Sequence, residues 1–131
     1  MEQKLQNLLD ELERAGAAND TLETDRSRKM LNLESDTARL IAILARASSA
    51  TRVIEIGTSN GYSTIWLAWA VAPAGGRVIS IEKSPQKHAM AEKILFVPDL
   101  RTTSNYGLVM HRQSHESYLV HSTSCFSTRT A

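Results

Sequence analysis

Leucines in the first fifteen positions recur at the spacing of one helix face. Leu5, Leu8, Leu9 and Leu12 follow the i, i+3, i+4, i+7 pattern. The pattern predicts an amphipathic helix from about residue 3 to Ala15, with Gly16 as its stop. Residues 17–32 are mostly polar and are typical of a loop or a short helix.

A second helical pattern begins after this polar segment. Ser35 and Asp36 are favourable N-cap residues, and Ser48-Ser49 closes the segment. We expect the helix to bury one apolar face, made of Leu40, Ile41, Leu44 and Ala47.

The pattern then changes to short β-branched runs that alternate with helical segments. Residues 52–56 and 77–82 are predicted as buried strands. An apolar helix containing Trp66 and Trp69 lies between them, and we interpret both indoles as core residues. Ser84 and Pro85 start a further helix that reaches about Leu95. Strand, helix and strand in this order predict a βαβ unit with parallel strands.

The composition changes after residue 95. Residues 1–95 contain 14 alanines and residues 96–131 contain one, whereas Ser and Thr make up 11 of these last 36 positions. Such a step indicates segments of different origin. We expect residues 96–131 to be a divergent tail, either out of frame or disordered. Within it, residues 106–110 and 118–120 are each predicted as a short strand of a small sheet.

Charge and cysteine content exclude several classes of protein. Fifteen basic and fourteen acidic residues leave a net charge of +1, which argues against nucleic-acid binding. No apolar run approaches the roughly 20 residues that cross a bilayer, so we expect no membrane association.

The acidic, amphipathic N-terminus is unlike a signal peptide. The single cysteine, Cys125, forms no internal disulfide, so we expect a cytoplasmic protein.

The loop after the first predicted strand carries the clearest chemical signal. It reads E-I-G-T-S-N-G-Y-S-T from Glu55 to Thr64. Ligands of parallel sheets bind at the carboxyl ends of strands, and Gly57 and Gly61 permit tight turns and close approach of a ligand. The dinucleotide fingerprint is absent because position 59 is serine. Glu55 beside this loop favours a cationic ligand over a pyrophosphate.

A second carboxylate lies at the end of the next predicted strand. Glu82 follows Glu55 by 27 residues, and an acid at this place accepts both hydroxyls of a ribose. The two carboxylates predict a nucleoside with a cationic, phosphate-free extension. S-adenosylmethionine has this chemistry.

From Met30 to Glu82 the sequence resembles class I S-adenosylmethionine-dependent O-methyltransferases of the catechol and caffeoyl-CoA O-methyltransferase group. The residues that carry the resemblance are M-L-N-L-E-S-D-T-A-R-L-I-A-I-L-A-R-A and R-V-I-E-I-G-T-S-N-G-Y-S-T-I-W-L-A. The resemblance covers about residues 1–95. It implies an α/β fold, the N-terminal part of a Rossmann-like methyltransferase domain, with two helices, then strand, helix, strand and helix, and an incomplete parallel sheet.

The resemblance also implies roles for individual residues. Glu55 is expected near the methionine amino group, Ser63 at its carboxylate and Glu82 at the ribose, while Leu33 offers a backbone contact. The predicted cofactor-binding residues are Leu33, Glu55, Gly57, Thr58, Ser59, Gly61, Tyr62, Ser63 and Glu82.

The catalytic half of the family pattern is not found. Members of the family hold a divalent metal, Mg²⁺, with downstream aspartates and an asparagine, and no such motif occurs between Phe96 and Ala131. We therefore predict no metal ligand and assign no catalytic residue. Two functions stay open. One is an O-methyltransferase acting on a hydroxyl of a small, catechol-type acceptor, impaired by this loss. The other is a non-catalytic cofactor-binding or helix-mediated association protein. A homodimer is expected in either case.

Overall fold

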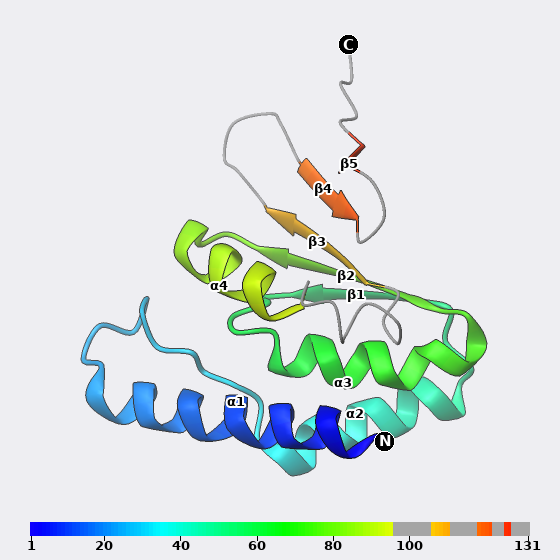
Figure 1. Cartoon of the computed structure of the whole chain (residues 1–131), viewed down its shortest axis with the longest axis horizontal. Coiled ribbons are helices and arrows are strands. Elements are labelled where there is room, and N and C mark those ends of the chain that lie inside the picture. Colours follow the sequence, from blue (N-terminus) through cyan, green and yellow to red (C-terminus); the bar gives the residue numbers. More distant parts are fainter. Residues whose placement is uncertain (96–105, 111–117, 122–124, 127–131) are drawn as a thin grey trace.

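The computed structural model describes residues 1–95 and the backbone of three strands, 106–110, 118–121 and 125–126. The helices are α1 (Gln3–Leu22), α2 (Ser35–Ala47), α3 (Tyr62–Val71), the 3-10 turn η1 (Ala72–Ala74) and α4 (Pro85–Leu95). The strands are β1 (Arg52–Ile56), β2 (Arg77–Glu82), β3 (Tyr106–Met110), β4 (Tyr118–His121) and β5 (Cys125–Phe126). Figure 1 shows α1, α2 and α3 gathered on one side of the strands.

The strands form one sheet in the order β1-β2-β3-β4-β5. β1, β2 and β3 are parallel, with Val53 opposite Val78 and Val78 opposite Tyr106. β4 and β5 are antiparallel to their neighbours, so the sheet is mixed rather than purely parallel. The strands predicted at 106–110 and 118–120 are present, and β4 extends to His121. The expectation that the rest of the tail is out of frame or disordered lies outside the described residues.

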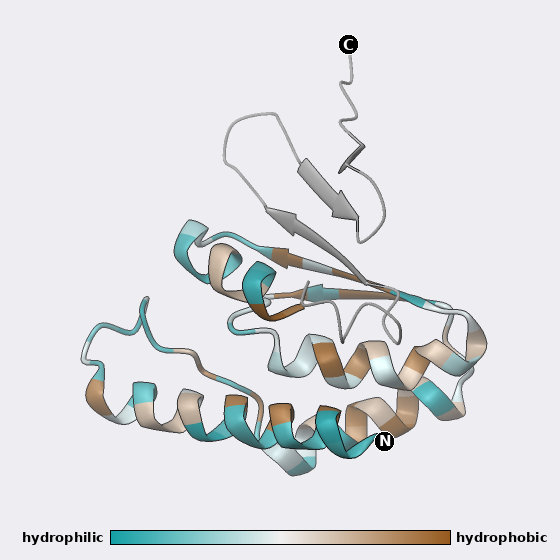
Figure 2. Ribbon diagram, viewed as in Figure 1, coloured by the Kyte–Doolittle hydropathy of each residue, from teal (hydrophilic) through white to brown (hydrophobic). Residues whose placement is uncertain are grey.

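The core lies between the helices and one face of the sheet. Leu5, Leu9 and Leu12 of α1 are buried with the apolar residues of α3, and Val78 of β2 is fully buried. Figure 2 shows hydrophobic residues along β1, β2 and α3. On the opposite face of β1, Ile54 and Ile56 are 68% and 86% exposed.

The first helix is longer than predicted. It continues through Gly16 to Leu22, and Gly16 is buried. A Cβ on Gly16 would lie 2.4 Å from the side-chain nitrogen of Asn32. The glycine therefore makes room for the chain that returns from α1, and it does not end the helix.

The prediction of which α2 residues are buried is wrong. Leu40 and Leu44 are 56% and 59% exposed, whereas Ala38 and Ala42 are buried. α2 packs against α3, and the small alanines allow the two helices to approach closely. The leucines consequently face away from this contact. The expected homodimer stays a prediction. Leu5, Leu9 and Leu12 of α1 are buried in this chain's own core, so these leucines are not available for helix-mediated association.

No helix among the described residues combines the length and the apolar character that a bilayer crossing requires.

Candidate functional site

A cavity of about 720 Å³ opens at the carboxyl ends of β1 and β2. This volume lies within the range of small-molecule sites. The loop from Gly57 to Ser59 forms one wall, and the segment from Met30 to Leu33 forms another. The position agrees with the rule that parallel sheets bind ligands where their strands end.

The backbone of the loop after β1 is held by the protein itself. Gly57 has a φ of +96°, and among the described residues no atom beyond its two chain neighbours lies within 4 Å of where its Cβ would be. The Gly57 amide donates to the Ile81 carbonyl at 2.8 Å. Ser59 has a φ of 52°, and its hydroxyl donates to the Met30 carbonyl at 2.7 Å. The loop is therefore fixed against both β2 and the segment before α2, and it leaves open space above Gly57.

Glu82 is buried at the end of β2 and lines this cavity. One carboxylate oxygen accepts the Ser59 amide at 2.9 Å, and the other accepts the Ser84 amide at 2.9 Å. A carboxylate has about four lone-pair positions. Each oxygen of Glu82 therefore keeps acceptor capacity for a ligand hydroxyl after these two bonds.

Glu55 supplies the second carboxylate, at the end of β1. It accepts hydrogen bonds from the hydroxyls of Ser63, Thr64 and Ser80, the last at 2.6 Å. The Thr58 and Ser80 hydroxyls lie 2.6 Å apart, so Thr58 joins this cluster. The cluster holds a negative charge beside the Gly57 loop, where it suits a cationic ligand group.

Seven of the nine predicted cofactor residues line the cavity. These residues are Leu33, Glu55, Gly57, Thr58, Ser59, Ser63 and Glu82. The Ser63 hydroxyl is directed to Glu55, although we expected it to contact a cofactor carboxylate. Each of these residues is thus placed at the site, while its role toward a ligand stays a prediction.

Gly61 and Tyr62 are not among the lining residues. Gly61 begins α3 with a φ of 86° and faces Leu95 of α4. Tyr62 is buried, and its hydroxyl donates to the Glu13 carboxylate of α1 at 3.4 Å. Burial raises the pKa of the Tyr62 phenol above its ordinary value. In this structure both residues join α3 to its neighbouring helices.

Met30, Trp66 and Lys87 line the cavity and were not assigned to it from the sequence. Trp66 is buried as predicted, and it serves both the core and the cavity wall. The Lys87 ammonium group donates to the Lys29 carbonyl at 2.6 Å and so bridges α4 to the segment before α2. No local pattern signals these contacts, because they join segments far apart in the sequence.

Within the described residues, no group of three or more His, Cys, Asp or Glu side chains is arranged to hold a metal ion. Glu55 and Glu82 are engaged by hydroxyls and backbone amides, as described above.

Comparisons with known proteins agree with this geometry. The profile of a family described as O-methyltransferase matches residues 2–98. A catechol O-methyltransferase of Mycobacterium tuberculosis is 40% identical over 78 residues, which are 60% of this chain and 33% of that protein. A catechol O-methyltransferase of Niastella koreensis is 36% identical over 63 residues, or 48% of this chain and 28% of that protein. The chain spans about a third of the length of these curated relatives.

Solved structures show the same likeness. An O-methyltransferase from Bacillus cereus in complex with SAH aligns with a TM-score of 0.61 and 26% identity, over 79% of this chain and 43% of that one. The O-methyltransferase TomG from Streptomyces achromogenes, in complex with SAM, aligns with a TM-score of 0.60 and 28% identity, over 86% and 44%. The predicted α/β fold, the N-terminal part of a Rossmann-like methyltransferase domain, is confirmed.

Proposed function

The chain belongs to the O-methyltransferase family, and on that premise we propose that it binds S-adenosylmethionine in the cavity at the ends of β1 and β2, for methyl transfer to a hydroxyl of a small acceptor. The observation that carries this proposal is the pair of carboxylates, Glu55 and Glu82, that line the cavity together with the Gly57 loop.

The described residues fit such a ligand. Glu82 keeps acceptor capacity on both oxygens, which suits two neighbouring ribose hydroxyls. Glu55 places a negative charge beside the Gly57 loop, where it would attract the ammonium and sulfonium groups of the ligand. The open space above Gly57 admits the ligand close to the backbone. When bound, S-adenosylmethionine supplies an electrophilic methyl group.

The protein residues named here bind and orient, and they move no proton. We assign no metal ion to the described residues, because they offer no suitable ligand group. Within the part of the chain that the structure describes, we therefore assign no group that activates the acceptor hydroxyl, and we expect little methyl transfer. We also propose a cytoplasmic location, which the single cysteine supports.

Calorimetry with S-adenosylhomocysteine tests the binding site. Glu82→Ala should weaken binding by about 10- to 150-fold, because charge-assisted hydrogen bonds of ~1.5–3 kcal/mol are lost. Glu92→Ala is the matched control, since Glu92 is an exposed carboxylate of α4 outside the cavity. Equal affinity of the Glu82→Ala variant and the parent would contradict the ribose role of Glu82.

A radiolabelled-methyl assay with catechol-type acceptors, Mg²⁺ and Mn²⁺ tests activity separately. Turnover near the ~10 per second that is typical of enzymes would show that this chain contains a catalytic group that we have not assigned.

A further inference from the structure

A second hollow, of about 1370 Å³, adjoins the cofactor cavity. It lies between the segment 25–31 and the first turn of α4. Met30, Leu31, Glu82, Lys83 and Lys87 line both spaces. A molecule in this hollow would therefore lie next to whatever occupies the cofactor cavity.

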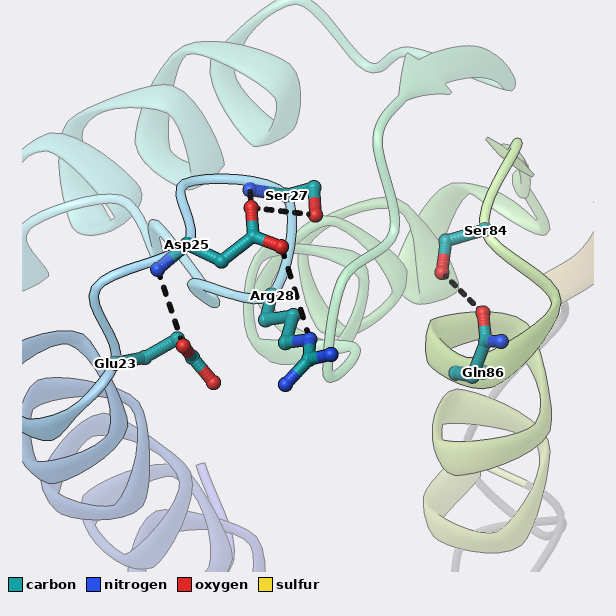
Figure 3. Close-up of polar contacts among 6 residues, drawn as sticks. All are labelled: Glu23, Asp25, Ser27, Arg28, Ser84 and Gln86. Carbon is teal, nitrogen blue, oxygen red and sulfur yellow. Dashed lines mark hydrogen bonds and ion pairs between the residues drawn. The ribbon is translucent and has the colours of Figure 1, made fainter.

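The hollow carries an excess of positive charge. Its lining includes four cationic side chains, those of Arg26, Arg28, Lys83 and Lys87, but only two carboxylates. Figure 3 shows the loop from Glu23 to Arg28 on one side and Ser84 with Gln86 on the other.

Both carboxylates are already engaged by groups of the protein. Asp25 accepts the Ser27 amide at 2.9 Å and the Ser27 hydroxyl at 2.8 Å, and it lies 3.7 Å from the Arg28 guanidinium. The Ser27 hydrogen bonds hold the pKa of Asp25 below its ordinary value, and Arg28 adds to the effect. Glu82 accepts the two backbone amides described above.

The cations are less completely paired. Lys87 uses one donor on the Lys29 carbonyl and keeps two more. Among the residues that the structure describes, the side chains of Arg26 and Lys83 make no hydrogen bond or ion pair, although both line the hollow. These donors are available to an anion that enters between the loop and α4.

Apolar side chains complete the lining. Met30, Leu31 and Met90 lie among the charged residues. Such a mixture suits an organic anion, with its carbon framework on the methionines and its charged group on the cations.

We infer that this hollow binds the anionic group, a carboxylate or a phosphate, of the methyl acceptor, so that the preferred acceptors are anionic rather than neutral. The inference rests on the proposed function, because it places the acceptor beside the cofactor cavity. It assigns Arg26 and Lys83 to the recognition of charge.

A pair of nearly isosteric probes tests the inference. We would measure by calorimetry the binding of 3,4-dihydroxybenzoate, which is anionic, and of 3,4-dihydroxybenzamide, which is neutral. Each is titrated with and without saturating S-adenosylhomocysteine. The benzoate should bind about tenfold more tightly, the effect of roughly one charge-assisted hydrogen bond. The difference should shrink as salt is added, because these cations are partly open to solvent.

Two variants locate the effect. Arg26→Gln and Lys83→Gln should each weaken benzoate binding several-fold and leave benzamide binding unchanged. Lys93→Gln is the control, because Lys93 is an exposed lysine of α4 that does not line the hollow. Salt-independent or equal binding of the two probes, or a preference that survives both variants, would overturn the inference.

Failure of the proposed function gives a different result. If S-adenosylhomocysteine does not bind, the cofactor proposal fails, and with it the inference about a methyl acceptor. If it binds while the probes bind equally, the cofactor proposal stands and only the anion site is lost.

Discussion

At the scale of single residues, the described structure contains a few backbone positions with a positive φ, which favour glycine. Gly61, the N-cap of α3, is one of them, because its φ is 86° and Leu95 packs against the place where its Cβ would be. Gly75 also has a positive φ, but in the described part of the chain no atom beyond its two chain neighbours lies within 4 Å of where its Cβ would be. A comparison of substitutions at the two glycines therefore distinguishes the cost of backbone strain from the cost of steric crowding.

Gly61→Ala should destabilise the protein more than Gly75→Ala. Both substitutions place alanine at a positive φ, which costs about 1–2 kcal/mol. Only at Gly61 would the new Cβ lie 3.1 Å from a Leu95 methyl carbon. The free energies of unfolding, from urea titrations, give the comparison. Equal losses for the two variants would show that Leu95 moves aside freely.

Tyr62 makes the stability depend on pH in the alkaline range. Its pKa is raised by burial, and the Glu13 carboxylate beside it acts in the same direction. The folded state therefore retains the phenol proton after the unfolded state, with a pKa of about 10, has lost it. The stability from this group is complete below about pH 10 and is lost as the pH rises through the folded value.

The free energy of unfolding should consequently fall more steeply above about pH 10 in the parent than in Tyr62→Phe. Tyr106 and Tyr118 are present in both proteins and provide a common background. Denaturant titrations at several pH values measure the two slopes. Parallel curves would mean that Tyr62 ionises as freely in the folded protein as in the unfolded chain.

At the scale of elements, the helices differ in which of their apolar residues they bury. Leu9 of α1 is 1% exposed, whereas Leu44 of α2 is 59% exposed. Leu9→Ala should cost about 2–5 kcal/mol, and Leu44→Ala should change stability by less than about 0.5 kcal/mol. Urea denaturation of both variants checks this. A large loss of unfolding free energy for Leu44→Ala would indicate that Leu44 is buried, as the sequence pattern predicts for α2.

The order of the elements could be predicted from the sequence, because each carries its own local period. The orientation of α2 could not, since both Leu40 with Leu44 and Ala38 with Ala42 have helical spacing. Only the contact with α3 decides between these faces. The end of α1 was missed for a similar reason, because the role of Gly16 depends on Asn32, sixteen residues later.

The candidate site divides in the same way. Glu55 and Glu82 could be placed because Glu55 is the next-to-last residue of one predicted strand and Glu82 is the last of the other, and the strand ends of a parallel sheet share one edge. Lys87 could not be placed, because its position at the cavity follows from a hydrogen bond to Lys29, 58 residues away. Site residues at the ends of strands could be predicted from the sequence. Site residues that reach the cavity through packing between distant segments could not.

At the scale of the whole molecule, the described sheet is covered unevenly. The helices bury Val78, whereas Ile54 and Ile56 of β1 are exposed. β1 is also the first strand in the sheet order, so within the described part of the chain no strand pairs with its outer side. Exposed apolar residues on an edge strand favour self-association.

Ile56→Lys should therefore reduce the concentration-dependent light scattering of the 131-residue protein. Its free energy of unfolding should change by less than about 0.5 kcal/mol, because Ile56 is 86% exposed. Leu40→Lys, an exposed apolar position on α2, is the control for added charge alone. If both variants reduce scattering equally, the edge of β1 has no special part in the association.

Ser59 has a consequence for the kinetics of ligand binding. Its hydroxyl donates to the Met30 carbonyl and its amide donates to Glu82, so that the protein's own hydrogen bonds hold the loop on two sides. A ligand that enters beside Gly57 would thus find the loop backbone already ordered. We expect binding to need no separate step in which the loop becomes ordered. Among related ligands, association rates should then be similar, and their affinities should differ mainly in residence time.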